Sequence, residues 1–164
     1  MSEANEISSQ FERAYRLHQQ GKLREAFLRY DAIIKAMPRH APALHYSGVV
    51  LHQSGKFDAA IERIRASLAI DPQEADAWSN LAIALQASGR QDLAINAFVE
   101  AARLAPNSSS VLANLAGAQL LAGRHAEAEA SARQLLERYI ERYGATNSPY
   151  IAQARERLTK LRSR

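Results

Sequence analysis

The 164-residue chain has the composition of one ordinary globular domain, with 47% hydrophobic and 23% charged residues and a formal net charge of +4. This content excludes a disordered chain and is sufficient for one core. The absence of cysteine excludes disulfides, zinc–thiolate sites and thiol nucleophiles. We expect a cytoplasmic protein without membrane insertion, because the N-terminus is acidic and no apolar run approaches the roughly 18 residues of a membrane span.

Three residue types recur along the chain at an interval of 34 residues. The positions are Gly21, Gly55, Gly89 and Gly123, then Pro38, Pro72 and Pro106, and then Ala26, Ala60, Ala94 and Ala128. A fixed period of this length, kept over four units, predicts a repeat architecture.

Apolar residues between these positions follow helical spacing, as in Leu81 and Leu85 before Gly89 and Leu93 and Phe98 after it. Each unit is therefore predicted to be two amphipathic helices joined at a glycine. Glycine supplies the backbone freedom needed where the first helix ends, and proline ends the second helix. The recurring alanine is expected where two helices lie too close for a larger side chain.

The four units occupy residues 7–40, 41–74, 75–108 and 109–142. The first unit has Gln10 and Arg13 where the third has Trp78 and Leu81. A terminal repeat is expected to differ in this way, because one of its faces has no neighbouring repeat.

The C-terminal end departs from the period. Ile140 stands where the fourth proline is expected, so the second helix of that unit is predicted to continue and to stop near Gly144. Ser148 and Pro149 are suited to the start of another helix, predicted over residues 148–162. We interpret this segment as a capping helix that covers the last repeat, and a docking helix for a following domain or partner is the alternative.

The third unit shows the repeat pattern most completely, at Trp78, Leu81, Ala82, Leu85, Gly89, Ala94, Phe98, Ala101 and Pro106. This pattern is similar to that of the tetratricopeptide repeat (TPR) family, and the resemblance extends from residue 7 to about residue 142. The resemblance implies an all-α, right-handed solenoid of antiparallel helix pairs. In such proteins the first helices line a concave groove, which usually binds an extended peptide or a helix.

The resemblance also implies which side chains face the groove. The candidate peptide-binding residues are Tyr15, His18, His45, Tyr46, Val49, His52, Gln53, Asp76, Ser79, Asn80, Ile83, Gln86, Asn114 and Gly117. None of the inward-facing positions holds lysine or arginine, which disfavours the carboxylate clamp of the family's co-chaperones. The groove is aromatic and histidine-rich in the first two repeats and small and apolar in the fourth.

Two asparagines, Asn80 and Asn114, occupy the same position of consecutive repeats. This arrangement is similar to the asparagine ladder in the repeat region of O-linked N-acetylglucosamine transferases, including bacterial proteins of that type. An asparagine amide offers both an acceptor and a donor, so it can pair with a peptide backbone. The alternative is an asparagine that bonds across repeats and fixes the angle between them.

The sequence lacks the motifs of common catalytic and cofactor sites. It contains no phosphate-binding loop, dinucleotide fingerprint or nucleophile elbow, so we expect neither enzyme activity nor a cofactor. His18 and His52 share one position in adjacent repeats, but no carboxylate accompanies them on that face. Polar residues lining the groove are therefore preferred over a metal site.

The preferred interpretation is a non-catalytic scaffold that binds a protein or peptide in the groove. Three alternatives remain open: the N-terminal substrate-recognition region of a larger transferase, a small chaperone of secreted subunits, and self-association through the terminal repeats. Nucleic acid is disfavoured as a partner. The positive charge lies from Arg133 onward, with eight basic and three acidic residues, whereas the preceding part has thirteen basic and fourteen acidic residues.

Overall fold

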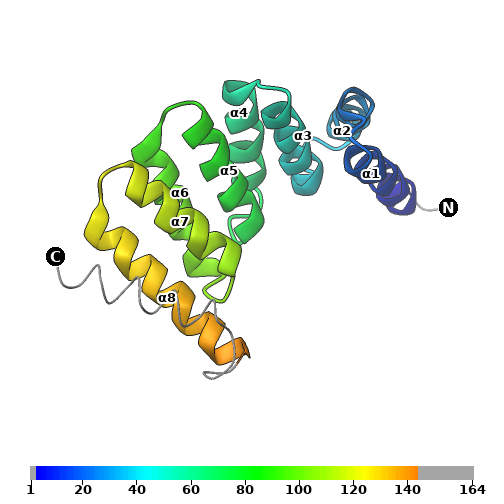
Figure 1. Cartoon of the computed structure of the whole chain (residues 1–164). Coiled ribbons are helices and arrows are strands. Elements are labelled where there is room, and N and C mark those ends of the chain that lie inside the picture. The colour runs from blue at the N-terminus through cyan, green and yellow to red at the C-terminus, as the bar shows by residue number, and fades with distance from the viewer. Residues whose placement is uncertain (1–2, 144–164) are drawn as a thin grey trace.

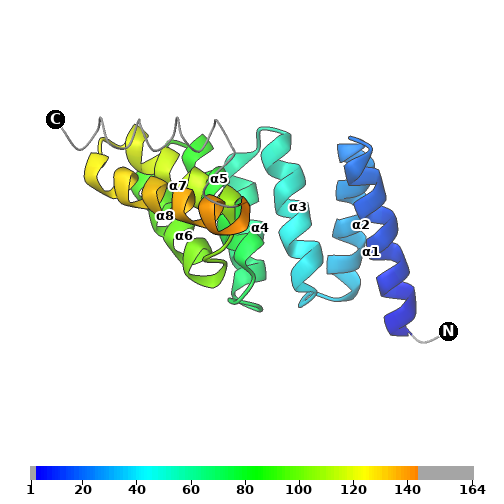
Figure 2. The same cartoon turned by 60° about the horizontal axis from the view of Figure 1, so that its bottom comes forward.

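The structure, a computed structural model, describes residues 3–143, and this part of the chain folds into α-helices without a strand (Figure 1). The helices are α1 (Glu3–Gln19), α2 (Leu23–Ala36), α3 (Ala41–Gln53), α4 (Phe57–Leu68), α5 (Ala75–Ala87), α6 (Gln91–Leu104), α7 (Ser109–Leu121) and α8 (His125–Tyr143). Consecutive helices pack against each other, and Figures 1 and 2 show the pairs stacked along one direction from α1–α2 to α7–α8. The all-α solenoid is confirmed, and the helix predicted over residues 148–162 lies outside the described residues.

The turns inside each pair have the geometry that the glycines predict. Gly21, Gly55, Gly89 and Gly123 have φ between 72° and 79°, the left-handed region that strains any other residue. At Gly89 the N–H donates to the Gln86 carbonyl over 3.0 Å, and the Arg90 N–H donates to the Leu85 carbonyl over 2.9 Å. These bonds satisfy carbonyl groups that the helix end would leave unpaired.

The second helices end where the sequence predicts. Helices α2, α4 and α6 stop before Pro38, Pro72 and Pro106, respectively. Helix α8 continues to Tyr143, because the position of the fourth proline is taken by Ile140, which permits a continuous hydrogen-bond ladder. The predicted extension of this helix is therefore confirmed.

Small residues allow the two helices of a pair to approach closely. The four periodic alanines are buried, three of them completely. Gly48 marks a closer approach, at a position where the other three repeats hold Ala14, Ala82 and Ala116. A Cβ atom there would lie 2.5 Å from Cγ1 of Ile64 and 3.0 Å from the carbonyl oxygen of Ala60. Helices α3 and α4 therefore pack at a separation that excludes a side chain at this position.

Two hydrophobic clusters form the core. The N-terminal cluster contains Ile7, Ala14, Ala26, Tyr30, Ile33, Ala43 and Val50. The second cluster extends from Leu51 to Ala118 and is mostly alanine, leucine and isoleucine, with Phe98 as its one fully buried ring among the described residues. Phe27 packs against both clusters. The core is therefore continuous along the stack, as expected for a solenoid.

Candidate peptide-binding groove

The predicted groove residues lie on the first helices of the four pairs, α1, α3, α5 and α7. Contacts join α1 to α3 and α3 to α5, so side chains from the first three repeats adjoin one another. Most of these side chains remain at least partly exposed, including Val49, His52, Ser79, Ile83 and Gln86. Asn114 on α7 is exposed, and Gly117 is exposed as well.

Four rings form an aromatic cluster at the N-terminal end of the groove: Phe11, Tyr15, Tyr30 and Tyr46. The Tyr46 ring forms T-shaped pairs with Tyr15 and Phe11, with centroid distances of 5.1 and 5.8 Å, respectively. It is stacked on the Tyr30 ring, with a centroid distance of 6.2 Å. Each such pair contributes about 0.5–1.5 kcal/mol beyond the burial of its area. Phe11, Tyr15 and Tyr46 are partly exposed, whereas Tyr30 is completely buried.

Phe11 lies on α1 at one of the inward-facing positions that the family resemblance implies, so the groove pattern predicts it. Tyr30 is the member of the aromatic cluster that the groove pattern does not include. Tyr30 lies on α2, whereas the candidate residues all come from first helices. The sequence contains one indication of this, because Tyr30 occupies the same position in the first repeat as Phe98 does in the third.

Two hydrogen bonds link the first helices of adjacent repeats. The His18 Nε2 atom lies 2.9 Å from Oε1 of Gln53, and the His45 Nε2 atom lies 2.9 Å from Nδ2 of Asn80. In both pairs the two residues are 35 positions apart in the sequence. The same sequence separation is therefore bridged at two successive interfaces between repeats. We call the two hydrogen-bonded pairs the cross-repeat pairs.

The His45–Asn80 pair bears on the two interpretations of the asparagines. His45 is only 5% exposed, and burial lowers its pKa, so the neutral ring accepts a hydrogen bond from the Asn80 amide. The Asn80 amide N–H is also the donor that would bind a peptide backbone in an asparagine ladder, and here it is engaged by His45. Ser79 takes the place of His45 in the next repeat, and Asn114 there is exposed. The geometry of Asn80 therefore favours the interpretation in which it fixes the angle between repeats.

A third histidine, His40, acts at the start of α3. Its Nδ1 atom accepts the backbone N–H of Ala43 over 3.0 Å and so caps the helix. Burial lowers its pKa, and its ring lies 5.5 Å from that of Phe11. The neutral form of His40 thus supports both the helix and the edge of the aromatic cluster.

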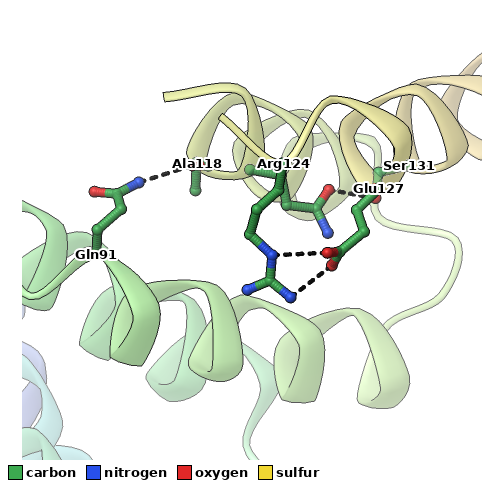
Figure 3. Close-up of polar contacts among 6 residues, drawn as sticks. Gln91, Ala118, Arg124, Glu127 and Ser131 are labelled. Carbon is green, nitrogen blue, oxygen red and sulfur yellow. Dashed lines mark hydrogen bonds and ion pairs between the residues drawn. The ribbon is translucent and has the colours of Figure 1, made fainter. Parts of the chain in front are cut away.

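Polar contacts hold the last two repeats together (Figure 3). The Gln91 side chain donates to the carbonyl oxygen of Ala118 over 2.8 Å, and the buried Ser131 hydroxyl donates to Gln119 over 2.8 Å. Arg124 makes a two-pronged ion pair with Glu127 at 2.7 and 2.8 Å. The Gln91 and Ser131 bonds link α7 to α6 and to α8, whereas the Arg124 ion pair lies at the start of α8.

The end of α7 presents apolar side chains. Leu120 is 56% exposed and Leu121 is 75% exposed within the described part of the chain. A cavity of about 540 Å³ lies between α7 and α8 and is lined mainly by Gly117, Leu120 and alanines of both helices, together with His125 and Glu129. The fourth repeat therefore offers an aliphatic surface, in contrast to the ring-rich first two.

Two further features, a candidate metal-binding group and a membrane-spanning helix, are not found within residues 3–143. This region contains no group of three or more histidine, cysteine or acidic side chains placed to bind a metal ion. None of the helices it forms has both the length and the apolar character needed to cross a bilayer.

Stacked antiparallel helix pairs with a 34-residue period define a helical-repeat protein of the interaction-scaffold class. A family model described as tetratricopeptide repeat matches residues 11–75, 53–109 and 79–143. The chain belongs to the tetratricopeptide repeat family.

Solved structures of the TPR-containing protein MamA share the fold. A double mutant of the RS-1 protein superposes with a TM-score of 0.79 at 21% identity, covering 87% of this chain and 80% of the other. A MamA fragment from Desulfovibrio magneticus RS-1 gives 0.78 at 20% identity, covering 84% and 77%. Another MamA crystal structure gives 0.78 at 19% identity, covering 89% and 81%. Comparison with curated protein sequences gave no significant match.

Proposed function

We propose that the protein is a non-catalytic scaffold that binds an extended peptide or a helix segment of a protein partner in the groove formed by α1, α3, α5 and α7. One observation carries the proposal: rings and polar side chains from successive first helices adjoin one another and stay partly exposed. Partly exposed aromatic residues surrounded by neutral polar groups are typical of the residues that dominate binding energy at protein interfaces. The absence of catalytic motifs and of cysteine supports a non-enzymatic role in a reducing, cytoplasmic compartment.

Selection of peptides from a displayed library tests the groove directly and requires no natural partner. The affinity of a selected peptide is then measured by fluorescence anisotropy for the wild type and for Tyr15→Ala and Gln86→Ala. We expect each variant to weaken binding, by about tenfold for Tyr15→Ala if the ring is an anchor.

Val99→Ala is the matched control, because Val99 is exposed on α6, a second helix outside the groove. Circular dichroism establishes that each variant keeps its helix content. The groove assignment is contradicted if Val99→Ala weakens peptide binding while Tyr15→Ala and Gln86→Ala leave it unchanged.

A second candidate function is self-association through the fourth repeat, which the exposure of Leu120 and Leu121 favours. Light scattering of the full chain over a concentration series measures it. We expect the average mass to rise with concentration in the wild type and to stay monomeric in a Leu120→Glu, Leu121→Glu double variant. A concentration-independent monomer in both proteins contradicts this candidate.

A further inference from the structure

A small cavity opens at one end of the aromatic cluster. It has a volume of about 190 Å³ and lies between the start of α3 and the loop that joins α4 to α5, with Phe11 of α1 as a further wall. Pockets that bury a drug-sized molecule have about 300–1,000 Å³. The cavity therefore has the size to receive a single side chain of a bound segment.

Two aromatic rings form the walls of this cavity. Phe11 and Tyr46 meet at 66° with their centroids 5.8 Å apart, and both are partly exposed. The face of an aromatic ring attracts a cation. His45 completes this wall, and since burial lowers its pKa it adds no positive charge near neutral pH.

Two carboxylates stand at the rim of the same cavity, Asp71 and Glu74. Glu74 is the N-cap residue of α5, yet its side chain makes no capping hydrogen bond. Asp71 accepts the Gln73 N–H through Oδ1 over 3.1 Å, a bond that occupies one of its two carboxylate oxygens. Among the described residues that line the cavity there is no lysine or arginine.

Carboxylates at the start of α5 also act on Tyr46. The pKa of Tyr46 is raised mainly by burial and by the neighbouring Tyr15, and the carboxylates of Asp76 and Glu74 raise it further. Asp76 follows Glu74 in the first turn of α5 and is exposed. The cavity thus combines two aromatic rings with two carboxylates and, among its described lining residues, no lysine or arginine, an arrangement that is complementary to a cation with a flat apolar surface.

We propose that this cavity binds an arginine side chain of the segment that occupies the groove. The inference rests on the proposed function and specifies the chemistry of the partner. A guanidinium group lies flat on a ring face, and its fork of N–H donors matches carboxylate oxygens such as those of Asp71 and Glu74. A lysine ammonium is more strongly hydrated and lacks the planar fork, so it gains less from the same walls.

The test uses the full chain, labelled with ¹⁵N, and small probes. Nα-acetyl-arginine amide is titrated against the protein and compared with Nα-acetyl-citrulline amide, which has nearly the same shape and no charge. We expect saturable shifts of the Tyr46, Asp71 and Glu74 amide resonances with the arginine probe, and binding of the citrulline probe weaker by about fivefold or more.

Glu74→Gln and Asp71→Asn remove one charge each, and the asparagine keeps the acceptor for the Gln73 N–H. Each is expected to weaken binding of the arginine probe by about two- to fivefold, the factor that corresponds to an exposed ion pair. Asp92→Asn is the control, because Asp92 is an exposed carboxylate in the first turn of α6 and does not line the cavity. It should leave the affinity for the arginine probe unchanged.

Three results overturn the inference: equal binding of the citrulline probe, equal binding of Nα-acetyl-lysine amide, or insensitivity of the affinity to both Glu74→Gln and Asp71→Asn. Because these probes need no partner, the two proposals fail separately. If the affinity of the selected peptide depends on Tyr15 but the arginine probe causes no saturable shift, only the proposed arginine site is contradicted. Saturable arginine binding together with a peptide indifferent to Tyr15 removes the groove function instead.

Discussion

The first two repeats and the last two use different side chains to fill equivalent positions. In the N-terminal half, Tyr30 stacks on Tyr46, and a histidine–asparagine pair joins the second repeat to the third. In the C-terminal half, Phe98 packs among aliphatic side chains, and α7 exposes Leu120 and Leu121. The comparison shows that the 34-residue period determines where the helices begin and end, whereas the residue types at the inward-facing positions differ from repeat to repeat. Ring contacts and histidine hydrogen bonds between first helices are therefore found in the N-terminal half of the described structure.

The largest expected effect comes from a glycine of the N-terminal half. Gly48→Ala places a Cβ 3.0 Å from the backbone oxygen of Ala60 and 2.5 Å from Ile64, so α3 and α4 must move apart. We expect the free energy of unfolding to fall by about 1–3 kcal/mol. Urea denaturation followed by far-UV circular dichroism measures it.

Gly117→Ala, at an exposed helical position of α7, is the control. Within residues 3–143, no atom beyond the neighbouring backbone of its own helix lies within 4 Å of the added Cβ, so the higher helix propensity of alanine dominates. The free energy of unfolding should rise by about 0.5–1 kcal/mol. Changes of the same sign at Gly48 and Gly117 would contradict the close approach of α3 and α4 at Gly48.

The second prediction separates the two asparagines. Asn80→Ala leaves His45 buried without its cross-repeat partner, which should lower the free energy of unfolding by about 1–3 kcal/mol. Asn114→Ala removes an exposed side chain and should change it by less than about 0.5 kcal/mol. Denaturant titration of both variants measures the difference, and equal losses would show that Asn80 has no special structural role.

The third prediction concerns pH and again involves the N-terminal half. Burial lowers the pKa values of His45 and His40 in the folded protein below the ordinary value of 6.5. The unfolded chain therefore binds more protons just below that value, so the free energy of unfolding falls as the pH is lowered through this window and is constant above it. Denaturant titrations at a series of pH values measure the trend.

His40→Ser sharpens the pH experiment, because serine can still accept the Ala43 N–H as an N-cap residue but does not titrate. The variant should show a weaker pH dependence than the wild type. An unchanged dependence would mean that His40 contributes nothing to it.

The sequence predicts the fold more completely than the site. Glycine with positive φ, proline beyond a helix end and alanine at a close approach act locally, so their spacing alone predicts the helix pairs. The extension of α8 past Ile140 follows from the same reasoning. The His45–Asn80 bond depends on the separation of neighbouring repeats, which no local pattern determines. Tyr30 reaches the aromatic cluster from a second helix through tertiary packing, so a pattern confined to first helices misses it.

The smallest expected effect is that of Tyr30→Phe, at a position equivalent to that of Phe98 in the third repeat. Tyr30 is completely buried, and its hydroxyl has no hydrogen-bond partner among the described residues. Burial also raises its pKa, so the hydroxyl stays protonated. Tyr30→Phe removes a polar group that has been desolvated without compensation, and should leave the free energy of unfolding unchanged or raise it by up to about 1 kcal/mol.

The reverse change, Phe98→Tyr, introduces a hydroxyl into the aliphatic C-terminal half and should lower the free energy of unfolding by about 1–3 kcal/mol. Thermal and urea unfolding of the two variants measure the pair of effects. A marked loss of stability in Tyr30→Phe would contradict the first expectation, because it would mean that a water molecule or another group satisfies the Tyr30 hydroxyl. The expected outcome is a gain in stability, or no change, for Tyr30→Phe and a loss for Phe98→Tyr. It would show that phenylalanine packs at least as well as tyrosine at position 30.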